Sequence, residues 1–65
     1  MNINETITDL KKSIAHYSAE LSQVSSQIGD GTKASATMRI NKCQKLIAEI
    51  AACYRTLQTL KDLQG

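Results

Sequence analysis

A chain of 65 residues is long enough for one small domain but too short to bury a large core, so its stability is expected to depend on a partner or on self-association. Eight Lys and Arg against six Asp and Glu give a formal net charge of +2, which is too balanced for the dense basic face of a nucleic-acid-binding protein. No apolar run is long enough to span a bilayer and the first residues lack the features of a signal peptide, so we expect a cytoplasmic protein that binds neither membranes nor nucleic acid.

The first half of the chain carries a single apolar stripe. Its apolar residues recur at alternating intervals of four and three, which is the spacing of a coiled-coil seam. Asn2 is placed to cap the start of this helix, and the residues between the seam positions are small, polar or charged. We therefore predict a helix over residues 3–28 that one partner helix can cover. Its seam consists of Ile3, Ile7, Leu10, Ile14, Tyr17, Leu21, Val24 and Ile28.

Gly29-Asp30-Gly31 interrupts the helical pattern. Gly29 is placed to adopt the left-handed conformation that ends a helix, and Asp30 or Thr32 can cap the next one. Because the predicted turn, residues 29–32, is short, the two helices should lie antiparallel. The predicted fold class is all-α, a single antiparallel two-helix hairpin with coiled-coil heptads over residues 1–65.

The second predicted helix, residues 33–63, carries more apolar positions than one partner helix can cover. One set steps by three and four and is assigned to the seam, in a register that places Ile7 opposite Leu57 and Leu10 opposite Tyr54. A second set recurs every seven residues beside it and is predicted to be exposed, which usually marks a binding surface on so small a protein. The predicted seam set is Ile40, Cys43, Ile47, Ile50, Tyr54 and Leu57, and the predicted exposed set is Leu46, Cys53 and Leu60.

Side chains with catalytic or metal-binding chemistry do not converge in this pattern. His16 falls on the solvent side of the first helix and Cys43 in the seam, so they cannot form a nucleophile and its base. The carboxylates are scattered along the rod, and one His with two distant Cys makes no metal set. Cys43 and Cys53 lie about 15 Å apart along one helix, beyond disulfide reach, and are expected to be reduced. We therefore expect no catalytic activity, no cofactor and no metal.

Three basic residues gather on the second helix near the turn. Arg39, Lys42 and Lys45 can form an ordinary solvated helix face, or a rim that orients an acidic partner. The sequence leaves both interpretations open.

The length, the two long helices, the Gly29-Asp30-Gly31 turn and the second apolar row resemble one known family, the small co-chaperones of type III secretion needle subunits (YscE/PscE/AscE/EscE-type proteins). The resemblance covers nearly the whole chain. It implies a bacterial cytoplasmic protein linked to virulence that binds a tetratricopeptide-repeat chaperone. Together the two would keep the aggregation-prone needle subunit monomeric until export. The family offers no catalytic residues to transfer.

The partner-binding residues are inferred from periodicity. We predict that the second helix binds the partner, and can self-associate, through its exposed apolar surface. The alternative is a self-assembling structural subunit, either needle-like or a homo-oligomeric helical bundle. The predicted partner-binding residues are Met38, Leu46, Ile50, Cys53, Leu57, Leu60 and Leu63.

Overall fold

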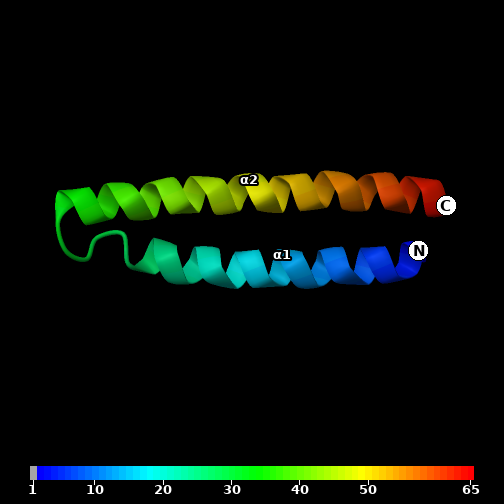
Figure 1. Ribbon diagram of the computed structural model, residues 1–65, viewed down its shortest axis with the longest axis horizontal. Helices are drawn as coiled ribbons and strands as arrows, with labels where there is room; N and C mark the ends of the chain where they lie inside the picture. The colour runs from blue at the N-terminus through cyan, green and yellow to red at the C-terminus, as the bar shows by residue number, and fades with distance from the viewer. Residues whose placement is uncertain (1) are drawn as a thin grey trace.

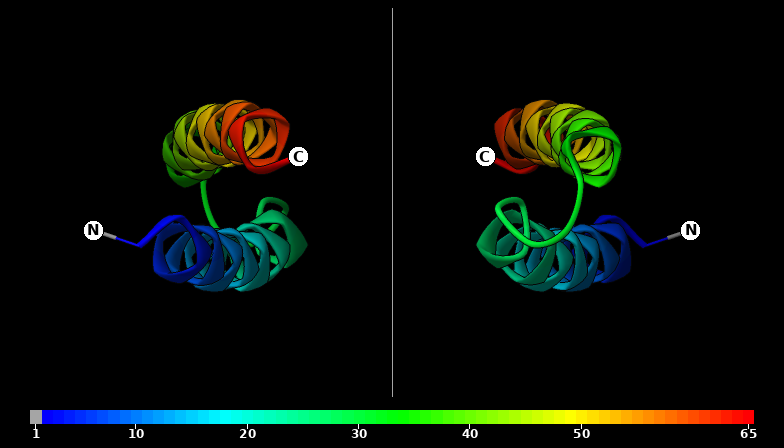
Figure 2. Two further views of the ribbon diagram at one scale, coloured as in Figure 1. Left: turned by 90° about the vertical axis from the view of Figure 1, so that its right-hand side faces the viewer. Right: turned by 90° about the vertical axis from the view of Figure 1, so that its left-hand side faces the viewer.

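The computed structural model describes residues 2–65, which form two long helices joined by a short turn (Figure 1). Helix α1 spans Ile3–Ser26 and helix α2 spans Lys33–Gln64. They lie antiparallel, side by side, in a rod with extents of 48 × 16 × 14 Å, and both termini are at the end opposite the turn (Figure 1). The end-on views show one pair of helices without a third layer in the part of the chain described (Figure 2). The predicted all-α hairpin is confirmed.

Both helices begin at a side-chain cap. The Asn2 side chain accepts a hydrogen bond from the Asn4 backbone N–H at 2.8 Å, as expected. The Thr32 hydroxyl oxygen accepts one from the Ser35 backbone N–H at 3.2 Å. Of the two candidate caps for α2, Thr32 is therefore the one used.

The turn differs from the prediction at its start. Helix α1 ends at Ser26, two residues before the predicted end, because the backbone tightens there: the Gln27 N–H donates to the Val24 carbonyl at 3.1 Å. The positive φ falls at Gly31, at +84°, and not at Gly29 as predicted. Since the helix closes early, the left-handed residue is needed later, where the chain turns into α2.

The seam of α1 is the predicted one. Ile7 and Ile14 are buried, the following seam positions are half-buried, and Ile3 at the open end is exposed. The half-buried positions are Leu10, Tyr17, Leu21, Val24 and Ile28.

The seam of α2 is rotated by one row from the prediction. Cys43 and Leu57 are buried as expected, but Leu46 is buried as well, with 6% of its surface exposed. Cys53 and Leu60 pack against the core cluster of Ile7, Ile14 and Leu57. Three residues predicted to lie in the seam are exposed instead, at 43%, 54% and 56%. These are Ile40, Ile47 and Tyr54.

The periodicity of α2 is satisfied by both arrangements. Cys43, Ile50 and Leu57 belong to both possible seams. Adding either the observed row or the predicted row to these three residues gives the same alternation of intervals of three and four. The observed row is Leu46, Cys53 and Leu60, and the predicted row is Ile40, Ile47 and Tyr54. Spacing alone therefore cannot choose between the two rows.

The ends of the hairpin favour the observed row. Near the chain termini, the observed row extends the seam with the apolar Leu60. The predicted row would instead place the charged Lys61 against the start of α1. At the turn, the observed row brings Arg39 beside the loop, where its guanidinium donates a hydrogen bond to the Asp30 carbonyl. In the middle it replaces the large Tyr54 with Cys53, which allows closer packing of the two helices.

Candidate interaction surface

The seven predicted partner-binding residues do not share one face. Leu46 and Leu57 are buried at 6% exposure each. The prediction that Leu46 is exposed is wrong, and Leu57, which was also predicted to lie in the seam, is enclosed there and cannot present a binding surface. Met38 and Leu63 are exposed, at 73% and 71%, as predicted. The other three, Ile50, Cys53 and Leu60, are half-buried in the hairpin seam. The predicted set is therefore mainly intramolecular packing.

The apolar excess of α2 lies on the opposite flank of the seam. Ile40, Ile47 and Tyr54 recur every seven residues and expose about half of their surfaces; we call them the α2 row. The sequence pattern places these three residues in the seam of the hairpin, and the structure places them beside it. The excess of apolar surface on α2 was correctly expected, and only its location changes.

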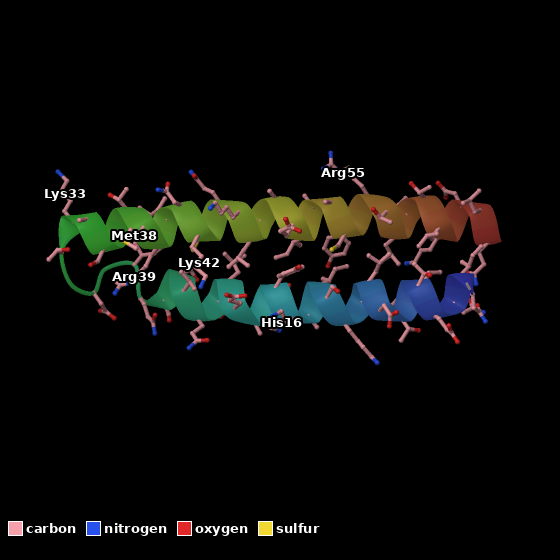
Figure 3. The ribbon with its side chains drawn as sticks, in the orientation of Figure 1. His16, Lys33, Met38, Arg39, Lys42 and Arg55 are labelled. Atoms are coloured by element: carbon pink, nitrogen blue, oxygen red, sulfur yellow. The ribbon has the colours of Figure 1, made fainter. Side chains whose placement is uncertain are left out.

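The ion pair between Lys42 and Glu20 identifies the two sides of the hairpin. The Lys42 ammonium lies 3.2 Å from a carboxylate oxygen of Glu20, and Figure 3 shows Lys42 reaching from α2 toward α1. At about 100° per residue, Lys42 lies to one side of the α2 seam and the α2 row lies to the other. The α2 row is therefore on the side of the hairpin away from this pair.

Helix α1 adds small and polar side chains to the same side. By helical periodicity, the α1 flank away from Glu20 carries Lys11, Ser18 and Ser25, and Ala15 and Ser22 lie next to them. All five are exposed. Together with the α2 row and its neighbours Gln44, Ala51 and Gln58, they form a broad surface on which Lys11 is the charged residue, with Lys33 and Lys61 beyond its two ends; we call it the low-charge face.

The basic residues near the turn are partly used within the hairpin. Arg39 points into the loop and Lys42 toward Glu20, whereas Lys33 and Arg55 point away from α1 (Figure 3). Lys45 is exposed. Two of the three predicted rim residues therefore contact other parts of the hairpin, and the Lys42 side chain stays 55% exposed.

His16 and Cys43 lie in different environments, as their heptad positions predict. His16 is exposed and lies 3.9 Å from Glu20, while Cys43 is buried in the seam. Within residues 2–65, no three His, Cys, Asp or Glu side chains lie close enough together to hold a metal ion. Neither of the described helices is long and apolar enough to cross a membrane.

Comparisons of the chain with protein-family models, with curated proteins and with solved structures found no match.

Proposed function

We propose that this protein is a non-enzymatic binding module that presents the α2 row to a helical partner. The observation that carries the proposal is the exposure of Ile40, Ile47 and Tyr54 at 43%, 54% and 56%, in one line along a single helix. Scattered exposed apolar residues are normal, but a periodic line on a protein of this size is typical of an interface.

The spacing of the row fits a groove between helices. With Gln44, Ala51 and Gln58 it steps by four and three, so an apolar groove can take Ile40, Ile47 and Tyr54 as successive anchors. Tyr54 combines a large apolar ring with a hydroxyl that can find a partner at the edge of such a groove. A concave array of helical repeats offers a groove of this kind.

The resemblance to the type III secretion co-chaperones supports a specific version of this function. In it, the hairpin binds a tetratricopeptide-repeat chaperone in the bacterial cytoplasm and helps to keep a needle subunit monomeric. The contact would be made by the α2 row, in place of the Leu46, Cys53 and Leu60 set.

Co-purification tests this proposal. The tagged chain is co-expressed with the tetratricopeptide-repeat chaperone and needle subunit of the same bacterium, and the recovered complex is quantified. We expect Ile47→Asp and Tyr54→Asp to lower recovery at least tenfold, because each places a charge in an apolar groove. Thr59→Asp is the matched control, since Thr59 is exposed on α2 away from both the seam and the α2 row.

Two results would overturn the proposal. One is the absence of any complex with the unchanged chain. The other is recovery of the complex at an undiminished level with both row variants, while circular dichroism shows that they remain helical.

A self-assembling subunit is the second candidate, and the low-charge face favours it because almost no like charges oppose contact between copies. Light scattering of the pure protein separates the two. Filaments that grow with concentration would favour the subunit, and small discrete species the binding module.

A further inference from the structure

We infer that a second copy of this chain covers the low-charge face. The two α2 helices would pack antiparallel, with the two-fold axis level with Glu49, and the two hairpins would form a four-helix bundle. This inference concerns the chain alone and does not depend on the proposed function.

Helix α2 carries a second complete seam beside the one that it uses inside the hairpin. Its residues step by four, three, four, three and four, the pattern that interlocks with another helix. None of them is charged, and all are exposed in the hairpin. The second seam consists of Ile40, Gln44, Ile47, Ala51, Tyr54 and Gln58.

The second seam is complementary to itself when it runs antiparallel. Ile47 then faces Ala51 of the second copy, so a large side chain meets a small one. Tyr54 faces Gln44 of the second copy, whose amide can bond the phenol hydroxyl, and Ile40 faces the flexible Gln58. Each pair occurs twice, as two-fold symmetry requires.

This register also uses the whole helix. Its two-fold axis is level with Glu49, and the midpoint of the helix, residues 33–64, falls between positions 48 and 49. The two α2 helices therefore overlap over their full length. Lys33 and Lys61, which continue the α2 row at either end, stay at the ends of the interface. A slip of one heptad would move one of them inward and shorten the overlap, so both charge and length specify the register.

The available area matches what a stable dimer needs. The whole side of the hairpin that carries the low-charge face has a flat area of roughly 770 Å², from extents of 48 and 16 Å, so a second copy that covers this entire side approaches the ~800 Å² per partner of a standard interface. The hairpin also has a small core, since within residues 2–65 only five apolar residues are buried and no side chain is completely enclosed. A second layer adds to the modest burial that the two-helix hairpin achieves alone.

Sedimentation equilibrium of the pure protein tests the inference. The chain has a mass of 7.1 kDa, and we expect a species of twice that mass at micromolar concentration. Ile47→Asp should give the monomer mass with unchanged helix content, and the control Thr59→Asp should remain a dimer. A monomeric unchanged chain at 100-fold higher concentration, a dimer that persists in Ile47→Asp, or a mass that rises without limit would each overturn the inference.

The orientation can be measured independently. Spin labels are attached at Glu49→Cys or Asp62→Cys in a Cys53→Ser background, where Cys43 is buried. In the antiparallel dimer the two labels at position 49 are level with each other along the helix axis, whereas those at position 62 are about 40 Å apart along it, from a rise of roughly 1.5 Å per residue. Equal distances at both positions would indicate parallel packing and contradict the proposal. Because these tests use the pure protein, their failure is distinguishable from failure to bind a chaperone.

Discussion

At the scale of single residues, Gly31 and Gly29 have different roles although they lie two positions apart. Gly31 has a φ of +84°, in the left-handed region that L side chains rarely adopt. A Cβ at Gly31 would meet the Ser35 side chain at 3.8 Å, an ordinary contact, so the cost of substitution is conformational. A Cβ at Gly29 would meet no atom within 4 Å, and its φ is not positive.

The two glycines therefore form a matched pair for mutation. We expect Gly31→Ala to lower the free energy of unfolding by about 1 kcal/mol, the cost of the left-handed conformation for alanine. Gly29→Ala should be neutral or slightly stabilising, because it restricts only the unfolded chain. Urea unfolding followed by circular dichroism measures both, and equal losses would contradict the assignment.

Ile14 tests the core in the same way. It is buried at 9% exposure with Ile7 and Leu57, so Ile14→Asp places an unpaired charge among apolar side chains. We expect the variant to lose most of its helical circular dichroism signal at 25 °C. Ala19→Asp, on the exposed side of the same helix, should keep it. A fully helical Ile14→Asp variant would show that this position is not enclosed.

At the scale of elements, the sequence determined α1 better than α2. Helix α1 has one apolar stripe, so its buried face could be predicted residue by residue. Helix α2 has apolar residues on both flanks of Cys43, Ile50 and Leu57, and two seams share those three positions. The choice between them depends on contacts with other parts of the chain, such as Arg39 at the loop, which periodicity does not contain.

The helix boundaries also divide into those set by nearby residues and those set by more distant parts of the chain. The cap at Asn2 was predictable, and the cap of α2 was narrowed to Asp30 or Thr32, because such side chains bond nearby backbone N–H groups, here those of Asn4 and Ser35. The end of α1 was not, because closure at Ser26 depends on the path of the turn.

The cap of α2 gives a prediction at this scale. Thr32→Ala removes the acceptor for the Ser35 N–H and should lower the free energy of unfolding by about 1 kcal/mol. Thr32→Ser keeps a hydroxyl and should restore most of that loss. Thermal unfolding of the three proteins measures the effect, and an equal loss in both variants would show that the hydrogen bond is not responsible.

At the scale of the whole molecule, both proposals use the α2 row. The same side chains cannot face a second copy and a helical-repeat chaperone at once, so we expect the two assemblies to exclude each other. Titrating the dimer with the tetratricopeptide-repeat chaperone should give a complex that holds one copy of this chain, as measured by light scattering. A complex that retains two copies would show that the two contacts use different surfaces.

Helix α2 turns Leu46 toward α1 and leaves Ile47 outside, although the two residues are adjacent, similar in size and equally apolar. Their exposed fractions are 6% and 54%. The most direct test compares Leu46→Ala with Ile47→Ala by urea unfolding, in a Tyr54→Asp background that prevents association. We predict that Leu46→Ala lowers the free energy of unfolding by about 2–4 kcal/mol and Ile47→Ala by less than about 1 kcal/mol. The reverse order would contradict this account and restore Ile47 to the hairpin seam.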